Sequence, residues 1–230
     1  MKKLLIVTAC AAILLTGCGK KEKAETRQPA AAQKQTCVAL SDAEIQQLLE
    51  KVKQTPMEPV EANEVAHLET NHGKMVVTFF TDKAPMTCTS FKRLVNAGYY
   101  DCTQFHRIIK NFMIQGGDIN SKDTIVGNEG MGGPGYSLPA EFNDTLHDKG
   151  ILSMARRGDD INSAGSQFFI CLSREGTKGL DNQYTAFGKV IEGLDVLEKI
   201  AMVETKMSDM GEMSAPVEPV YLVRAYMEKR

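Results

Sequence analysis

The chain has 230 residues, of which 43% are hydrophobic and 24% charged, an ordinary composition that fits one globular domain with extensions rather than two full domains. Its formal net charge of −2 gives no electrostatic reason to expect a nucleic-acid partner, so we expect none. The 12 methionines indicate adaptable apolar surface but do not identify a function.

The first residues have the features of an exported lipoprotein. Two lysines precede the apolar residues 4–15, a run too short to span a bilayer and typical of a signal peptide. The run ends in Leu15-Thr16-Gly17-Cys18, which resembles a bacterial lipobox. We therefore expect residues 1–17 to be removed and Cys18 to be lipidated, which would anchor the protein to a membrane. An ordinary cleaved signal with an incidental cysteine is the alternative.

The residues after Cys18 predict where the anchored protein lies. By resemblance to enterobacterial lipoproteins, Gly19 in place of Asp favours the outer membrane, facing periplasm or exterior, if the cell has one. We therefore expect a lipid-anchored protein of the cell envelope. Residues 18–40 should form the lipidated cysteine and a flexible tether, because most of them are polar or alanine and they hold little to bury.

A helical extension is expected at residues 41–64. Ser41-Asp42-Ala43-Glu44 has the spacing of a capping box, and apolar residues follow at helical intervals to about Lys53. The pattern does not decide whether this helix packs on the domain or contacts another chain.

Four cysteines remain after the signal peptide and Cys18, and an exported compartment permits disulfides between them. Cys171 lies in an apolar strand and is expected to be a small buried side chain. Free structural thiols are the simplest reading of all four, with a Cys88–Cys102 disulfide as the alternative. The other cysteine is Cys37, and the spacings do not resemble a zinc site.

Residues 65–230 are expected to form the globular domain. A hairpin is predicted from Val65 to Phe80, and a helix from Pro85 that ends at Gly98. The pattern further predicts two strands within 105–118, a glycine- and proline-rich loop over 116–140, strands at 150–155, 167–172, 185–190 and 220–227, and a helix at 194–200. Many short strands without βαβ alternation favour a mainly β fold, a closed antiparallel eight-stranded barrel capped by two helices.

The segment from Phe105 to Asp118 carries the most specific pattern. It places one arginine, two large apolar side chains and one amide where they could share a surface, without a nucleophile, base or metal cluster. Such a site suits rotation about a peptide bond. Four further motifs accompany this segment: Ala84-Pro85-Met86-Thr87 leading to Phe91, Gly150–Ala155, Ser166–Ile170 and Phe187–Val190. In their order and spacing, the five motifs together resemble the cyclophilin family of peptidyl-prolyl isomerases. The resemblance covers about Val65 to Met227 and implies a cyclophilin-like barrel that acts on X–Pro bonds without a cofactor.

The resemblance assigns the catalytic roles to Arg107 and Gln115. The barrier to rotation about an X–Pro bond is about 20 kcal/mol, because the nitrogen lone pair is delocalised into the carbonyl. A permanent cation near the prolyl nitrogen localises that lone pair and favours the twisted state. Gln115 would hydrogen-bond the substrate backbone or position the arginine. An arginine in a structural ion pair is the alternative for Arg107.

The resemblance also implies a substrate-binding site with an apolar floor for the proline ring, a second amide and backbone groups for an extended peptide. Its expected residues are Phe112, Met113, Ala155, Arg156, Gln167, Phe169, Leu180 and Tyr184. Three departures stand out. Arg156 replaces a common asparagine, and Tyr184 stands where many eukaryotic members have histidine. Gly179 stands where the family has a tryptophan associated with cyclosporin binding, so we expect weak or no binding of that drug.

The histidines suggest neither a general base nor a metal site. Neighbouring residues of a strand point to opposite faces, so His106 should face away from a surface that Arg107 shares. His67, His72 and His147 are scattered in turn-like settings, so we expect no bound metal. Asp118 is expected to be a turn residue that accepts hydrogen bonds from nearby amides.

The leading hypothesis is therefore a lipid-anchored peptidyl-prolyl isomerase, with no cofactor, that assists the folding of unfolded or exported proteins. The alternatives are a proline-peptide-binding chaperone with little catalysis, and a scaffold held through the helix near residues 42–53. The joint presence of the arginine and the apolar pocket residues favours the enzyme, because a pure binder does not need the cation.

Overall fold

The computed structural model describes residues 37–125 and 127–230. The expected signal peptide, the lipidation of Cys18 and the tether up to residue 36 lie outside the described residues. Within the described ranges, no helix is both long enough and apolar enough to cross a membrane.

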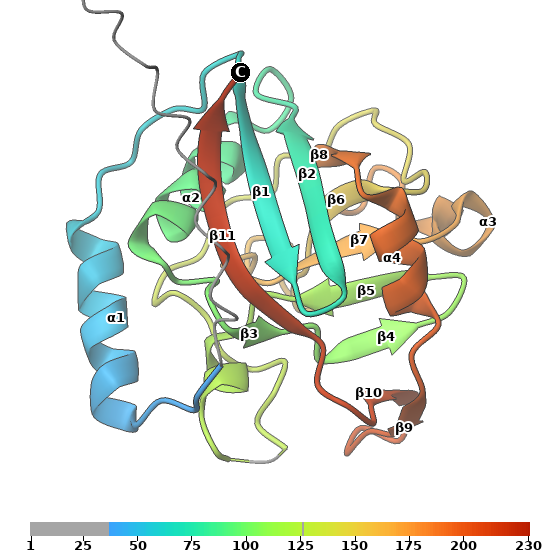
Figure 1. Ribbon diagram of the computed structural model, residues 1–230. Coiled ribbons are helices and arrows are strands. Elements are labelled where there is room, and N and C mark those ends of the chain that lie inside the picture. Colours follow the sequence, from blue (N-terminus) through green and yellow to red (C-terminus); the bar gives the residue numbers. More distant parts are fainter. Residues whose placement is uncertain (1–36, 126) are drawn as a thin grey trace, which may run out of the picture. The chain divides into compact units, whose positions relative to one another are not determined.

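An antiparallel sheet of nine strands organises the domain (Figure 1). In spatial order its strands are β3 (Thr103–Gln104), β11 (Tyr221–Lys229), β1 (Glu64–Thr70), β2 (Gly73–Phe79), β8 (Ala186–Glu192), β6 (Ile151–Met154), β7 (Phe168–Cys171), β5 (Met113–Gly116) and β4 (Arg107–Ile109). A hairpin of β9 (Thr205–Met207) and β10 (Met213–Pro216) lies next to β4. The prediction of a mainly β antiparallel fold is confirmed.

The predicted closed eight-stranded barrel differs from the observed sheet. The two edge strands, β3 and β4, are separated in sequence by only Phe105 and His106, so the sheet curls until its edges are close. Among the described residues, however, no strand pairing joins these edges. They are two and three residues long, too short for a closing ladder of hydrogen bonds, so the sheet is curled but open.

Helix α2 (Pro85–Ala97) covers an aromatic core. It begins with proline in its first turn and ends at Gly98, whose φ of +74° suits a glycine C-cap. Phe91 lies at the centre, with ring centroids 4.9–5.5 Å from those of Tyr100, Phe168 and Phe187. A second helix, α4 (Leu194–Ala201), packs against β2, β4 and β5. The remaining short helices are η1 (Ile119–Lys122), α3 (Arg174–Thr177) and η2 (Lys178–Leu180).

The predicted N-terminal helix forms α1 (Asp42–Gln54) and packs on the domain. Its capping box is present, because the Ser41 hydroxyl accepts from the Glu44 backbone and the Glu44 carboxylate accepts in return from the Ser41 backbone. Ile45 and Val52 are buried, and α1 lies beside α2 (Figure 1). The sequence pattern did not decide whether this helix packs on the domain or contacts another chain. In the structure, the apolar face of α1 packs on its own domain.

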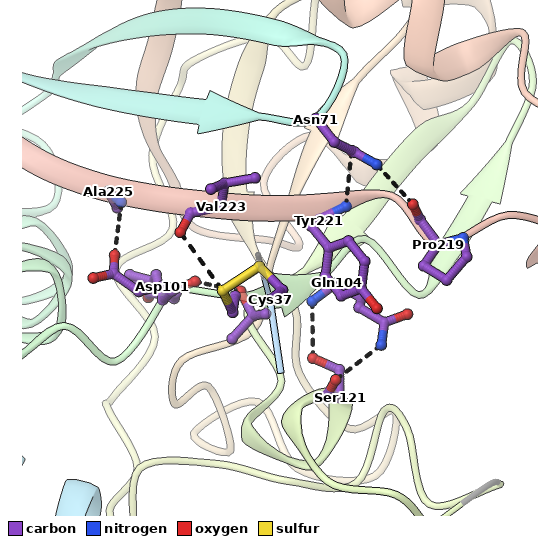
Figure 2. The surroundings of a disulfide bond; sticks show 12 residues. Cys37, Asn71, Asp101, Gln104, Ser121, Pro219, Tyr221, Val223 and Ala225 are labelled. Carbon is purple, nitrogen blue, oxygen red and sulfur yellow. Dashed lines mark hydrogen bonds between the residues drawn. A yellow bond between two sulfur atoms is a disulfide. The ribbon is translucent and has the colours of Figure 1, made fainter. Parts of the chain in front are cut away.

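The expectation of free cysteines was wrong for one pair, because a disulfide joins Cys37 to Cys102, with the two Cα atoms 5.3 Å apart (Figure 2). The alternative, a Cys88–Cys102 disulfide, was also wrong. Cys88 lies on the core side of α2 and donates its thiol proton to a buried backbone carbonyl of Phe187. Cys102 instead lies in the turn after α2, where the chain entering α1 passes next to β11. Cys171 is free and buried, as predicted.

Candidate active site

A pocket of about 130 Å³ opens where β4, β5 and β7 meet the segments that follow β6 and α3. It is lined by Arg107, Phe112, Met113, Gln115, Ala155, Arg156, Phe169, Leu180 and Tyr184. The remaining predicted residue, Gln167, is hydrogen-bonded to Gln115. The structure therefore brings all the predicted catalytic and substrate-binding residues together. A larger groove of about 490 Å³ lies elsewhere, between α1 and the turn that holds Cys102, and none of these residues lines it.

Strand register explains why residues distant in sequence meet in this pocket. Arg107 on β4 is paired with Gln115 on β5, which is paired in turn with Phe169 on β7. Paired residues share a face of a sheet, and so do residues two apart on one strand, which adds Met113 to the set. One face of three adjacent strands thus supplies the cation, the amide and the apolar floor.

The Arg107 guanidinium is held from three directions. Its Nη1 donates to Gln115 Oε1 at 3.3 Å and lies 3.8 Å from the Met113 sulfur. Its Cζ lies 5.9 Å from the centroid of the Phe112 ring. On the opposite side, Nε and Nη2 donate to the two carboxylate oxygens of Glu212, at 2.6 and 2.9 Å. The cation is thus oriented by its neighbours while one-third of its side chain remains exposed.

Sequence reasoning missed Glu212. This residue lies 105 positions from Arg107, in a methionine-rich stretch that matches no motif. The stretch forms the β9–β10 hairpin, which the strand pattern also did not predict. No signal in the sequence could have located the carboxylate, because its contact with Arg107 depends on how the hairpin docks against β4.

A short relay of amides fixes the orientation of Gln115. Its Oε1 accepts from Arg107, and its Nε2 donates to Gln167 Oε1 at 3.0 Å. The Gln167 Nε2 then donates to the backbone carbonyl of Gly132 at 2.9 Å. Each amide therefore has its donor and acceptor ends set by its neighbours, which fixes the orientation of Gln115 at the pocket.

The pocket floor is apolar and almost fully buried. Met113 is 1% exposed and Phe169 is 4% exposed, and both belong to a small hydrophobic cluster apart from the main core. The Phe169 and Tyr184 rings meet edge to face with centroids 5.7 Å apart. Phe112 and Leu180 complete the walls. Such a recess fits a small non-polar ring better than a charged or extended group.

The rim residues Ala155 and Arg156 follow β6. The Ala155 backbone N–H donates to the Gln167 carbonyl at 3.0 Å, which continues the pairing of β6 with β7. The Arg156 guanidinium lies over the Tyr184 ring at 4.6 Å and donates to the carbonyl of Gln183. The substituted arginine therefore stacks on the pocket wall and adds a cation at the rim.

A buried histidine supports the floor from behind. His147 is fully buried, its ring stacks on Phe169, and its two nitrogens contact Asp181 at 3.1 Å and the Ser153 hydroxyl at 3.0 Å. Burial lowers the pKa of this imidazole, against the opposing effect of Asp181. His147 lies outside the helices and strands, close to a turn, as predicted, but its ring is buried. The predicted turn-like setting was wrong for His67, which is buried in β1.

The other two predictions around the site hold. His106 does not line the pocket, and burial lowers its pKa. Asp118 caps η1, where its carboxylate accepts from the backbone N–H groups of Asn120 and Gly130. Within the described ranges, no group of three or more His, Cys, Asp or Glu side chains is arranged to hold a metal ion.

Comparison with known proteins identifies the family. Residues 65–227 match the family model of the cyclophilin-type peptidyl-prolyl cis-trans isomerases. The chain is similar to the human and bovine proteins named peptidyl-prolyl cis-trans isomerase-like 1, each 41% identical over 167 residues, which span 70% of this chain and 90% of the relative. It is also similar to a Schizosaccharomyces pombe peptidyl-prolyl cis-trans isomerase, at 40% identity over 160 residues, 69% of this chain and 95% of the relative.

The fold is similar to a crystal structure of a Cryptosporidium parvum cyclophilin-type peptidyl-prolyl cis-trans isomerase determined in the presence of the dipeptide Ala-Pro. The TM-score is 0.63 at 30% identity, and the match covers 72% of this chain and 99% of the other. The residues that the family model matches do not include the expected lipobox, so they do not bear on it. The chain belongs to the cyclophilin-type peptidyl-prolyl cis-trans isomerase family and is an enzyme of that class.

Proposed function

We propose that this protein accelerates cis–trans exchange at X–Pro bonds in unfolded or exported proteins and thereby assists their folding. The pocket would accept the proline ring, and Arg107 would stabilise the twisted amide. The observation that carries the proposal is that the guanidinium and the apolar floor open onto one pocket.

The proposed mechanism needs only binding and one cation. Burying the proline ring against Phe169 and Met113 fixes the ring while the acyl side of the bond turns. As the amide twists, its nitrogen becomes pyramidal and its lone pair, no longer delocalised into the carbonyl, is localised on the nitrogen. An N–H of Arg107 at that nitrogen is then bound more tightly in the transition state than in either ground state, which is the condition for acceleration.

Gln115 would act through the same geometry. Its amide lies between Arg107 and Gln167 and is positioned at the edge of the pocket. In the complex it would hydrogen-bond the substrate backbone next to the proline, or hold the arginine during rotation. Ala155 and Arg156 would bind the extended peptide on either side of the substrate proline.

The test is the isomerisation rate of a short Ala-Pro-containing peptide with the purified protein, with Arg107→Ala beside it. We expect the variant to lose roughly 10- to 1,000-fold in kcat/KM, as for removal of one transition-state donor. Arg224→Ala, an exposed arginine on β11, is the matched control and should match the wild type.

The same experiment separates the enzyme from a binding module. If the wild type and Arg107→Ala were equally slow yet bound the peptide equally well, the site would be a proline-peptide-binding module without useful catalysis. Peptide titration, followed by the chemical shifts of pocket residues, gives the binding side of that comparison.

We further propose that the protein is a lipid-anchored protein of the cell envelope. The support is the Leu15-Thr16-Gly17-Cys18 pattern after an apolar run, together with a disulfide in the domain, a bond typical of oxidising compartments. Growth with a labelled fatty acid should label the wild type and not Cys18→Ser. Equal labelling of both, or of neither, would argue against the anchor.

A further inference from the structure

One carboxylate occupies two of the three guanidinium nitrogens of Arg107. Glu212 accepts from Nε at 2.6 Å and from Nη2 at 2.9 Å, the forked geometry in which arginine and carboxylate match best. The third nitrogen, Nη1, is turned toward Gln115 and Met113, which line the pocket. The fork therefore fixes the plane of the guanidinium and determines which nitrogen faces the substrate.

Glu212 is presented by a built element. It ends the turn of the β9–β10 hairpin, where the Ser208 N–H donates to the Glu212 carbonyl and the Glu212 N–H donates to the Ser208 hydroxyl. Gly211 provides the positive φ of +76° that the turn requires. Because β10 lies beside β4, the hairpin carries its carboxylate to the strand that carries Arg107 (Figure 1).

The ion pair between Arg107 and Glu212 is partly exposed to solvent. The Arg107 and Glu212 side chains are 33% and 39% exposed, so water and a bound peptide can both reach them. The hydrogen bond from Arg107 lowers the pKa of Glu212 below its ordinary value, so the contact favours the charged carboxylate.

We propose that Glu212 is a positioning residue of the isomerase reaction, which holds Arg107 with Nη1 directed into the pocket. This inference rests on the proposed function. A free arginine side chain would have to lose its rotamer freedom each time the transition state forms, whereas the fork orders it beforehand. Glu212 itself does not line the pocket.

The opposite role would be a brake, in which the carboxylate neutralises the cation and competes with substrate. The geometry favours positioning, because Glu212 binds the two nitrogens away from the pocket and leaves Nη1 to the pocket side. The two roles predict changes of opposite sign when the carboxylate is removed.

The first experiment compares the peptide isomerisation rate and peptide affinity of the wild type, Glu212→Ala and Glu212→Gln. We expect kcat to fall about tenfold in Glu212→Ala and less in Glu212→Gln, which keeps one oxygen acceptor, with peptide affinity unchanged within about twofold. Glu218→Gln is the matched control, because this exposed residue loses the same charge just after the hairpin, and its rate should not change. A faster Glu212→Ala, or an unchanged one, would overturn the proposal.

A second measurement tests whether the effect passes through the arginine. In an Arg107→Lys background the side chain retains a cation but cannot form the fork. In that background, Glu212→Ala should change kcat by less than about twofold, because the forked contact between residues 107 and 212 is already absent. If the full tenfold loss persisted in this background, Glu212 would not act by positioning Arg107.

A spectroscopic readout keeps this proposal separate from the proposed function. In a spectrum of ¹⁵N-labelled protein, the Nε–H signal of Arg107 should be sharp and slow to exchange in the wild type and should broaden in Glu212→Ala. If the wild type lacked isomerase activity while that signal behaved as expected, the proposed function would be wrong, but Glu212 would still be shown to order the Arg107 side chain. If the wild type were active but the signal did not respond, the positioning role would fail alone.

Discussion

Removing the Cys37–Cys102 disulfide should markedly destabilise the domain. The bond links residues 65 positions apart, and the closed loop contains α1, β1, β2 and α2 complete. In the unfolded chain this link removes conformational freedom, and the chain-entropy relation gives about 4 kcal/mol for a loop of that length at 25 °C. For a domain of this size, that corresponds to a fall in Tm of roughly 8–16 °C.

The assay is thermal unfolding followed by circular dichroism, with and without a reducing agent. The double variant Cys37→Ser/Cys102→Ser should unfold at the temperature of the reduced wild type and should not respond to the reducing agent. Peptide mapping without reduction should find Cys37 and Cys102 in one linked pair. Cys88 and Cys171 should not interfere, since burial raises the pKa of each thiol to about 12 and keeps it unreactive.

The reasoning would be refuted if reduction and double substitution both left Tm within about 2 °C of the oxidised wild type, less than the shift expected for 1 kcal/mol. In that case the contacts around the entering chain, such as the hydrogen bond from the Leu40 N–H to the Lys122 carbonyl at 2.7 Å, would hold it without the link. The surroundings of the bond are shown in Figure 2.

Three further predictions concern other regions. Lys92→Met should cost about 3–5 kcal/mol in urea unfolding, because it leaves the buried Glu64 carboxylate without its cation; adding Glu64→Gln should recover most of this, and no recovery would contradict the reasoning. Burial lowers the pKa of His147 in the folded state, so the unfolded chain binds more protons below about pH 6.5. The free energy of unfolding should therefore fall between pH 7 and 5, less steeply in His147→Gln; an equal slope would exclude this residue as the cause. Gly179→Trp, at a position with open space around it, should tighten cyclosporin binding at least about tenfold by titration. An unchanged affinity would show that the absence of tryptophan at this position is not the cause of the expected weak binding.

Part of the candidate site was predictable because its information is local. Alternation along two short strands places Arg107, Met113 and Gln115 on one face. Phe169, on a third strand, joins them only through strand pairing. Only the resemblance to a family indicated which face forms the site, because large apolar residues on strands most often belong to the hydrophobic core. The order of the strands in the sheet needed the structure.

What sequence reasoning missed depends on contacts between distant segments. Cys37 and Cys102 meet because the chain entering α1 passes the turn after α2, and their separation in sequence gives no hint of it. Glu212 reaches Arg107 only because a hairpin docks beside β4. The turn-like setting of His147 was predictable, but the pattern gave no sign that its ring is buried behind Phe169.

The short edges of the nine-stranded sheet matter if the protein acts on unfolded chains, as proposed above. An extended polypeptide can add itself to any long open edge, where unpaired N–H and C=O groups act as a template for aggregation. Here the edge strands are two and three residues long, and the β9–β10 hairpin lies beside one of them. Under the proposed function, a substrate segment bound at the pocket would therefore find no long open edge in the described part of the sheet on which to add itself as a further strand.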